Sequence, residues 1–425
     1  MVPTLTRTTN DGAGHNASWK YVNNKTTSNQ TGVTVNVTDP AGNLTIVSFD
    51  GSVSGYQTES QSYQGSGGTP LVTKITCYNG TFTNCTTTNA GPRGALAITQ
   101  TDVFTYRNGS SSGSLLETKY DSYGDVIEVK QYDNGAVTSF PPAGAPTVSP
   151  LSDTTTVYGT WNGSACSAMS TVNSTIGAYM HAYPCTVTTV NSAGAMVSQK
   201  RYAYNAGGHP IQTQSWVSGT GTSAIYLSSS AIYTATGTVA TATGVNGAVS
   251  TYSYNGTDGC SNSVLSTSVT VKGTGLPAAG LTTSTQWNCN GAVATQTSDR
   301  NGQPTGYTYT DPLWRVTSIT DPLLNTSGYS YPTQTTSETT MSFPSASNKL
   351  HTTDGLGRVV ESQTRTAPGA NTFDNAIVYG YGWSATGAFT TQTLPGGSAL
   401  TTTQYDALGR LFTVTDAGGG TVSYT

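Results

Sequence analysis

The sequence predicts an all-β fold made of consecutive β-hairpins, with almost no helix. First, the heptapeptide YDALGRL at residues 405–411 recurs upstream in degenerate copies, as in repeat proteins. Second, short stretches of alternating Thr, Val, Ile and Tyr follow the copies, and such alternation is typical of half-buried strands. Third, no window of ten or more residues combines a 3.6-residue apolar period with helix caps.

The copies can be aligned along the chain. Residues 311–316 and 354–359 match the heptapeptide, with Trp314 in place of the glycine of the first copy. Looser copies begin at Tyr120 and Tyr204, and residues 287–291 form a weaker one. The positions that we assign to the structural repeat motif are Tyr120, Asp121, Gly124, Tyr204, Asn205, Gly208, Asp311, Arg315, Asp321, Asp354, Gly357, Arg358, Tyr405, Asp406, Gly409, Arg410 and Asp416.

The spacing of the motif arginines indicates the size of the unit. Arg358 follows Arg315 by 43 positions and Arg410 follows Arg358 by 52. Each interval is about two units of roughly 20–25 residues, so one degenerate unit is expected in each gap, at residues 383–387 in the second. Asp, Asn and Gly favour tight turns, because the short side chain bonds nearby backbone N–H groups and glycine accepts positive φ. Each unit therefore reads as strand, turn, strand, turn.

The motif resembles the YD repeats of RHS proteins. The resemblance rests on the Tyr-Asp-x-x-Gly-Arg-Leu string and on the Thr-Asp turns that follow it, at residues 320–322 and 415–418. The motif is clear over residues 289–425 and degenerate over residues 1–288. The resemblance implies one continuous antiparallel sheet that spirals into a partial or complete hollow shell, often around a toxic C-terminal domain. Related shells occur in teneurins and in the protein subunit of insecticidal toxin complexes.

The domain organisation expected from these repeats is one continuous array over residues 1–425, because each unit of an array buries surface only against its neighbours. Three compositional seams interrupt the pattern, near residues 141–152, 228–248 and 367–375. We interpret them as long loops between strands, in preference to domain linkers.

The composition favours an ordered sheet with hydroxyl-rich faces. Charged residues are 9% of the chain, against about 25% in typical soluble domains. The net charge is only −4 and 25 tyrosines are present, whereas disordered chains combine high net charge with few aromatic residues. The 17 basic residues are dispersed, so the sequence gives no support for nucleic-acid binding.

The six cysteines form three couples along the chain. In a sheet of consecutive hairpins, neighbours in sequence lie side by side, so we expect these couples to be the disulfides among fifteen possible connectivities. The alternative is free buried thiols in a cytosolic protein. No pair has the C-x-x-C spacing and the histidines lie elsewhere, which argues against zinc. The expected pairs are Cys77 with Cys85, Cys166 with Cys185, and Cys260 with Cys289.

Disulfides would place the protein outside the cell or at its surface. Residues 1–12 contain no apolar signal-peptide core, and no run of eighteen apolar residues predicts a membrane-spanning helix. We therefore expect either a leader that has been removed or a fragment of a longer chain. The end at Thr425, where a further Tyr-Asp would follow, favours the fragment.

A search for catalytic residues finds almost nothing. The four histidines, at positions 15, 181, 209 and 351, are scattered, and the motif aspartates have a sufficient structural role in turns. RHS shells often end in an Asp-Pro-x-Gly-Leu self-cleavage site, but residues 311–314 and 321–324 match only its first two positions. We expect no enzyme activity, no cofactor and no metal.

The sequence leaves two possible functions. In the first, which we favour, the chain is part of a shell whose partners are its own plug, core and cargo segments. In the second it is a surface adhesin that binds glycans, because rows of Tyr and Trp beside Asn and Thr could stack on sugars. For the motif arginines, packing across tyrosine rings and bonding to turn groups is favoured over ligand contacts.

Overall fold

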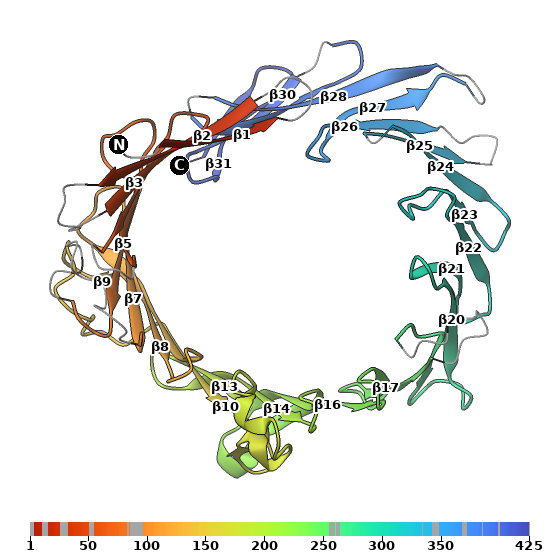
Figure 1. Ribbon diagram of the computed structural model, residues 1–425, viewed down its shortest axis with the longest axis horizontal. Coiled ribbons are helices and arrows are strands. Elements are labelled where there is room, and N and C mark those ends of the chain that lie inside the picture. Colours follow the sequence, from red (N-terminus) through yellow and green to blue (C-terminus); the bar gives the residue numbers. More distant parts are fainter. Residues whose placement is uncertain are drawn as a thin grey trace.

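Across the residues that the structure describes, one antiparallel sheet of 30 strands bends into a ring, so the expected all-β hairpin fold is confirmed (Figure 1). The computed structural model describes residues 4–10, 16–25, 33–50, 55–82, 85, 97–254, 260, 264–333, 335–341, 348–367, 372–384, 386–397 and 400–424. The described helical turns are three short 3-10 segments, η1 (Met169–Thr171), η2 (Gly177–Tyr179) and η3 (Gly221–Ser223).

The strands of the first half have the following bounds: β1 (Thr4–Asn10), β2 (Asn16–Lys25), β3 (Val33–Thr38), β4 (Leu44–Phe49), β5 (Gln57–Ser62), β6 (Val72–Tyr78), β7 (Gln100–Arg107), β8 (Gly113–Tyr120), β9 (Val126–Val137), β10 (Ser152–Tyr158), β11 (Thr160–Trp161), β12 (Cys166–Ser167), β13 (Pro184–Asn191), β14 (Met196–Tyr204) and β15 (Pro210–Ser218). Those of the second half are β16 (Ile225–Tyr233), β17 (Val239–Thr243), β18 (Val249–Ser253), β19 (Ser268–Lys272), β20 (Leu281–Asn288), β21 (Val293–Ser298), β22 (Pro304–Thr308), β23 (Ser318–Thr320), β24 (Thr326–Thr333), β25 (Thr336–Met341), β26 (Lys349–Thr353), β27 (Val359–Arg365), β28 (Phe373–Trp383), β29 (Ala388–Thr393), β30 (Leu400–Tyr405), β31 (Leu411–Thr415) and β32 (Thr421–Ser423).

Each strand of the large sheet pairs with the next one along the chain, and β10 pairs with β13 because β11 and β12 form a separate small hairpin. Consecutive turns therefore lie at opposite edges of the sheet. We call the edge with the turns that begin at Asp121, Asn205, Asp311, Asp354 and Asp406 the first rim. The opposite edge, the second rim, carries the turns that begin at Asp39, Asn191, Asp299, Asp321 and Asp416.

The prediction for one of the three compositional seams was wrong. Residues 228–248, expected as a long loop, contain the second half of β16 and all of β17. Their small residues still alternate, and Ser, Thr and Ala suffice because a paired strand needs ladder bonds more than side-chain bulk. Residues 141–151 do lie in the connection between β9 and β10. Residues 368–371 of the third seam are outside the described residues.

The outer face of the sheet can be identified from the segment 159–183, which lies on the outer side of the ring (yellow in Figure 1). Trp161 of this segment packs against Arg201, whose guanidinium carbon is 4.3 Å from the ring centroid. Arg201 therefore points outward. Residues directly opposite each other on paired strands share a face, so the register carries this assignment from strand to strand.

The two faces differ in chemistry in the second half of the ring. The outer face holds hydroxyl rows, namely Thr241, Thr251, Thr270 and Thr282, and beside them Ser253, Ser268, Ser284 and Ser298. The alternate positions, which face inward, are aromatic or aliphatic at Tyr252, Val269, Val271, Leu281, Tyr307, Ile319, Tyr329, Tyr379, Tyr381 and Val414. Over β17–β24 the wall is thus polar outside and more apolar inside.

A compact core lies on the outer face of β6–β8, where loops fold back over the sheet. Phe104 is fully buried, and the ring of Phe82 meets it edge-on with centroids 5.9 Å apart. Phe140 meets the buried ring of Tyr106 in the same way at 4.9 Å. The members of this core are Ile75, Cys77, Cys85, Phe104, Tyr106, Leu115 and Val137.

A buried carboxylate continues the row of core side chains. Asp102 is fully buried opposite Glu117 on the next strand, and both of its oxygens accept bonds of 3.0 Å from Gln100 Nε2. Burial raises the pKa of Asp102 to about 6, and the charge of Glu117 adds to the rise. The ionised form is disfavoured in the folded protein, so this residue lowers stability as the pH rises from about 4 through 6.

We expect Asp102→Asn to raise the free energy of unfolding at pH 7.5 by about 1–3 kcal/mol. The neutral amide avoids the cost of holding an ionised carboxylate in the core. The gain should shrink as the pH falls towards 4, where Asp102 is itself protonated. Urea titrations of both proteins at several pH values measure this difference. An equal effect at pH 4 and pH 7.5 would contradict the assignment.

Candidate functional site

The repeat motif builds a closed five-residue turn at the first rim. In the turn at Asp354, Oδ1 accepts the backbone N–H groups of Leu356 at 2.9 Å and Arg358 at 3.0 Å. Two backbone bonds complete the turn, from Gly357 to the Asp354 carbonyl and from Asp354 to the Arg358 carbonyl. Gly357 has φ +78°, which L-residues rarely adopt. The Asp and Gly positions of the motif are therefore set by backbone chemistry.

The motif arginine completes the same turn from its fifth position. Arg358 donates from Nε at 2.7 Å to Oδ2 of Asp354, whose side chain is fully covered. Equivalent pairs join Arg315 to Asp311 and Arg410 to Asp406. The bond from Arg315 lowers the pKa of Asp311 to about 2. Burial alone would raise the pKa of Asp354, but Arg358 and the turn N–H groups hold it below its ordinary value.

A tyrosine from the next hairpin covers each of the first two arginines. The guanidinium of Arg315 lies 3.9 Å from the ring centroid of Tyr331, and that of Arg358 lies 4.2 Å from Tyr381. The hydroxyls of these tyrosines donate at 2.9 Å to the carbonyls of Val316 and Val359, the residues directly after the arginines. Each turn is thereby joined to the next one on the same rim.

The hydroxyl bond recurs where the arginine is missing, and the sequence reasoning overlooked it. The sequence signal for this bond is a tyrosine at the end of a hairpin. Its hydroxyl bonds the backbone carbonyl just after the preceding first-rim turn. The further examples are Tyr78 to Gln57, Tyr158 to Val126, Tyr204 to Pro184, Tyr233 to Pro210, Tyr254 to Val239 and Tyr309 to Ala294.

The degenerate copies in the first half form the same turn. Asp121 Oδ1 accepts the N–H groups of Tyr123 and Asp125, and Asn205 Oδ1 accepts those of Gly207 and His209. The glycines of these turns, Gly124 and Gly208, have φ values of +88° and +78°. At the second rim, Asp321 and Asp416 cap equivalent turns, in which no arginine is the fifth residue. The capped turn therefore occurs at both rims, and the Asp–Arg ion pair is an additional contact in some first-rim turns.

Two turns place a bulky residue where the others have glycine. Trp314 has φ +57° and Leu324 has φ +65°, and Leu324 is 80% exposed. We expect Leu324→Gly to raise the free energy of unfolding by about 0.5–1 kcal/mol, since relief of the left-handed backbone outweighs the added chain entropy. Leu323, equally exposed and without positive φ, is the control, and Leu323→Gly should be destabilising. Thermal denaturation of both variants distinguishes these signs.

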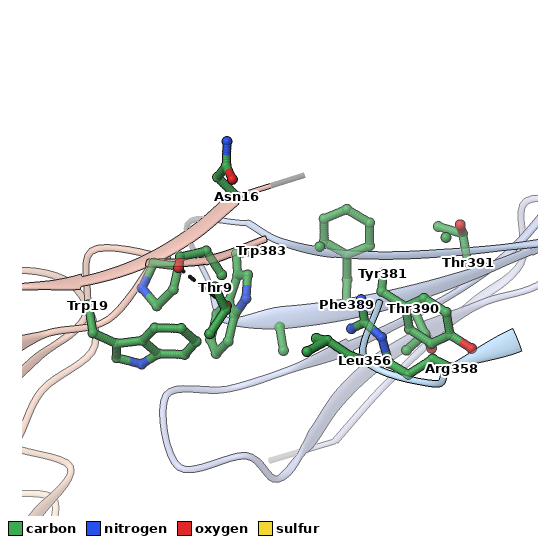
Figure 2. Close-up of a pocket in the computed structure, with 15 residues that line it drawn as sticks. Thr9, Asn16, Trp19, Leu356, Arg358, Tyr381, Trp383, Phe389, Thr390 and Thr391 are labelled. Carbon is green, nitrogen blue, oxygen red and sulfur yellow. Dashed lines mark hydrogen bonds between the residues drawn. The ribbon is translucent and has the colours of Figure 1, made fainter. Parts of the chain in front are cut away.

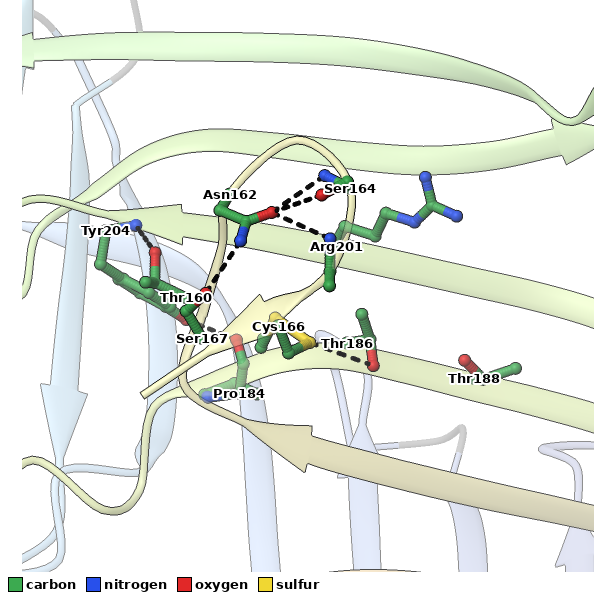
Figure 3. Close-up of a disulfide and its surroundings, with 12 residues drawn as sticks. Thr160, Asn162, Ser164, Cys166, Ser167, Pro184, Thr186, Thr188, Arg201 and Tyr204 are labelled. Atoms are coloured by element: carbon green, nitrogen blue, oxygen red, sulfur yellow. Dashed lines mark hydrogen bonds between the residues drawn. A yellow bond between two sulfur atoms is a disulfide. The ribbon is translucent and has the colours of Figure 1, made fainter. Parts of the chain in front are cut away.

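The structure joins the three cysteine couples as disulfides. Cys166–Cys185 fastens the outer segment 159–183 to β13 (Figure 3). Beside it, Asn162 Oδ1 accepts the N–H groups of Ser164 and Ala165, and Thr160 Oγ1 accepts the N–H of Tyr204 at 2.9 Å. All three bridges lie in or beside first-rim connections, where they stabilise the fold by restricting the unfolded chain.

The ring closes where the second rim of the first strands meets the first rim of the last strands. Gln64, in the turn between β5 and β6, donates from Nε2 to the carbonyl of Thr386 at 2.8 Å and accepts from the N–H of Ala407 at 3.4 Å. The indoles of Trp19 and Trp383 meet edge-on, with centroids 5.7 Å apart (Figure 2). We call this junction the closure seam. The sequence did not predict these contacts, because the partners lie more than 300 positions apart.

A cleft of about 740 Å³ lies along the closure seam. Trp19, Asn16 and Thr9 line one side, and Arg358, Tyr381, Trp383 and Phe389 line the other (Figure 2). The lining combines aromatic rings with hydroxyl and amide groups and contains no carboxylate.

Two of the described histidines stack on tyrosine rings. His181 stacks on Tyr123 and His209 stacks on Tyr233, while His15 is outside the described residues. Across the described ranges, no group of three or more His, Cys, Asp or Glu residues is placed to hold a metal ion. In the same ranges, no helix is long and apolar enough to cross a membrane.

Comparison with known proteins gives a family match over a short part of the chain. Residues 383–421 match the family model described as RHS Repeat. Similar solved structures are the crystal structure of TcdB2-TccC3-TEV (10% identity, 96% of this chain and 27% of that chain, TM-score 0.33) and that of TcdB2-TccC3 (11%, 97% and 28%, TM-score 0.32). A third is the Photorhabdus luminescens Tc holotoxin pore (11%, 96% and 27%, TM-score 0.23). This chain thus spans little more than a quarter of those chains. No curated protein matches it.

Proposed function

From the premise that residues 383–421 are an RHS repeat, we propose that this chain is a non-enzymatic segment of a protein shell. The segment forms part of a wall that encloses or presents another polypeptide domain of the same protein. The disulfides support a secreted or cell-surface location, because such bonds persist in oxidising compartments.

The observation that carries this proposal is the closed, two-faced sheet. A ring with hydroxyl rows outside and tyrosine and aliphatic side chains inside can hold apolar segments of a polypeptide away from water. The linked turns at the first rim keep such a wall in shape, because each Asp, Arg and Tyr group binds one hairpin to the next.

A second candidate is a surface adhesin that binds glycans. The cleft at the closure seam favours it, because Trp19 and Trp383 offer ring surfaces beside Asn16 and Thr9. Rings of this kind stack on the apolar faces of sugars, and the amide and hydroxyl groups meet sugar hydroxyls. This candidate needs no enclosed polypeptide.

Photocrosslinking in the natural full-length protein separates the two functions. Benzoylphenylalanine is placed at Tyr329, which faces inward, or at the adjacent Ser330, which faces outward and serves as the matched control. Enclosure predicts that Tyr329 crosslinks to another segment of the same protein and that Ser330 does not. Failure of both positions to capture any segment of the same protein would contradict enclosure. Glycan-array binding that is lost in Trp383→Ala would then favour the adhesin.

A further inference from the structure

The contacts at the closure seam differ in kind from those in the rest of the ring. Neighbouring strands elsewhere are held by backbone ladders, as in β6 and β7, whose register covers seven residue pairs. Among the described residues, no strand of β1–β5 is ladder-paired with a strand of β26–β32. The seam is instead a meeting of turns and side chains from the two rims.

Gln64 is the centre of these contacts. Its Nε2 is also within 3.2 Å of Oδ1 of Asn43, a buried side chain that accepts the N–H of Gly65 and donates to Asp39 Oδ2. This network fixes Gln64 to the second rim, from which the amide reaches two backbone groups of the first rim, on Thr386 and Ala407. One side chain therefore bridges two turns of the opposite rim.

The other described residues of the seam are loosely packed. The Trp19–Trp383 pair is a single edge-on contact, Trp383 stays 37% exposed, and the cleft of about 740 Å³ lies beside it. A ladder of several cooperative hydrogen bonds must break to separate strands elsewhere, whereas the contacts among the described residues of the seam are between side chains and turns. The seam is the least costly place for the ring to open.

We propose that the ring opens laterally at the closure seam, with Gln64 as the latch. The opened seam is a port in the wall through which a polypeptide enters or leaves the interior. The role of the port rests on the proposed enclosure, whereas the opening itself does not, and the two can fail separately.

Spin labels test the opening in the whole chain. Labels on Ser66→Cys and Leu411→Cys flank the seam, and labels on Ser66→Cys and Ser111→Cys lie on neighbouring second-rim turns on one side of it. The native cysteines are joined in disulfides, so the labels attach to the introduced ones. Pulsed electron paramagnetic resonance should give two distance populations across the seam and a single narrow one for the reference pair.

The latch is tested with Gln64→Ala. Loss of its hydrogen bonds should raise the ratio of open to closed molecules about tenfold. Gln199→Ala is the control, because Gln199 bonds Thr188 within the ladder-paired wall and should leave the ratio unchanged. A disulfide between Gln64→Cys and Ala407→Cys should abolish the long-distance population. A single narrow distance across the seam that Gln64→Ala does not alter, or an equal change in Gln199→Ala, would overturn the proposal.

Discussion

Phe104→Ala is expected to lower the free energy of unfolding of the β6–β8 region by about 3–5 kcal/mol, the usual cost of a cavity left by a deleted phenyl ring in a core. Phe104 is fully buried, and Phe82 and the Cys77–Cys85 bridge cover it. Few other described side chains of the ring are buried so completely, so neighbouring repeats have little core with which to compensate. Amide hydrogen exchange of β6–β8 measures the local effect.

Leu116→Ala is the control for this variant. Leu116 follows the core residue Leu115 on β8 but points to the inner face and is 39% exposed. Its loss should cost under about 1 kcal/mol, because little apolar area leaves a packed environment. Equal losses in the two variants would mean that the outer-face loops do not form a core over the sheet.

Asp354→Ala should have the second large effect, a loss of about 1–3 kcal/mol, from the lost turn cap together with an ion pair that is covered on the aspartate side but exposed on the arginine side. The substitution removes the acceptor for two turn N–H groups and leaves the Arg358 guanidinium without its covered carboxylate partner. Because Arg358 packs on Tyr381, the change should also loosen the next hairpin. Chemical denaturation measures the loss of stability, and the amide exchange rates of β26–β29 show how far along the sheet the loss extends.

Asp416→Ala separates the cap from the ion pair. Asp416 accepts the N–H groups of Gly418 and Gly420 as Asp354 does in its own turn, but Gly420 stands in the arginine position. Its loss should cost about 0.5–2 kcal/mol, in the range of other side-chain caps. A double-mutant cycle of Asp354→Ala with Arg358→Met should show a coupling energy, and its absence would assign the whole effect to the turn.

The repeat motif is a feature that the sequence predicts well. Asp354, Gly357 and Arg358 lie within five positions, so their turn chemistry is local and could be predicted from residue types alone. The cysteine couples could be predicted for a related reason, because the order of hairpins places sequence neighbours side by side. The strand at residues 239–243 was missed because Ala, Thr and Gly give a weak pattern there.

The sequence did not predict the tyrosine hydroxyl bonds. Tyr381 follows Val359 by 22 positions, and its contact depends on the strands between them having a particular length and register. A turn motif carries no information on that register. Only the paired strands decide which tyrosine meets which carbonyl.

The sequence by itself determined the hairpins, the turns that join them and the cysteine couples, because each depends on backbone preferences within a few residues or on neighbouring hairpins. The tertiary structure alone decided which face is inside, where the ring closes and which side chains close it. Curvature accumulates in small steps over the 30 strands of the sheet, and the sum brings Gln64 to Thr386, 322 positions away. No local pattern encodes such a sum, since a slight change in twist per strand would move the seam to different residues.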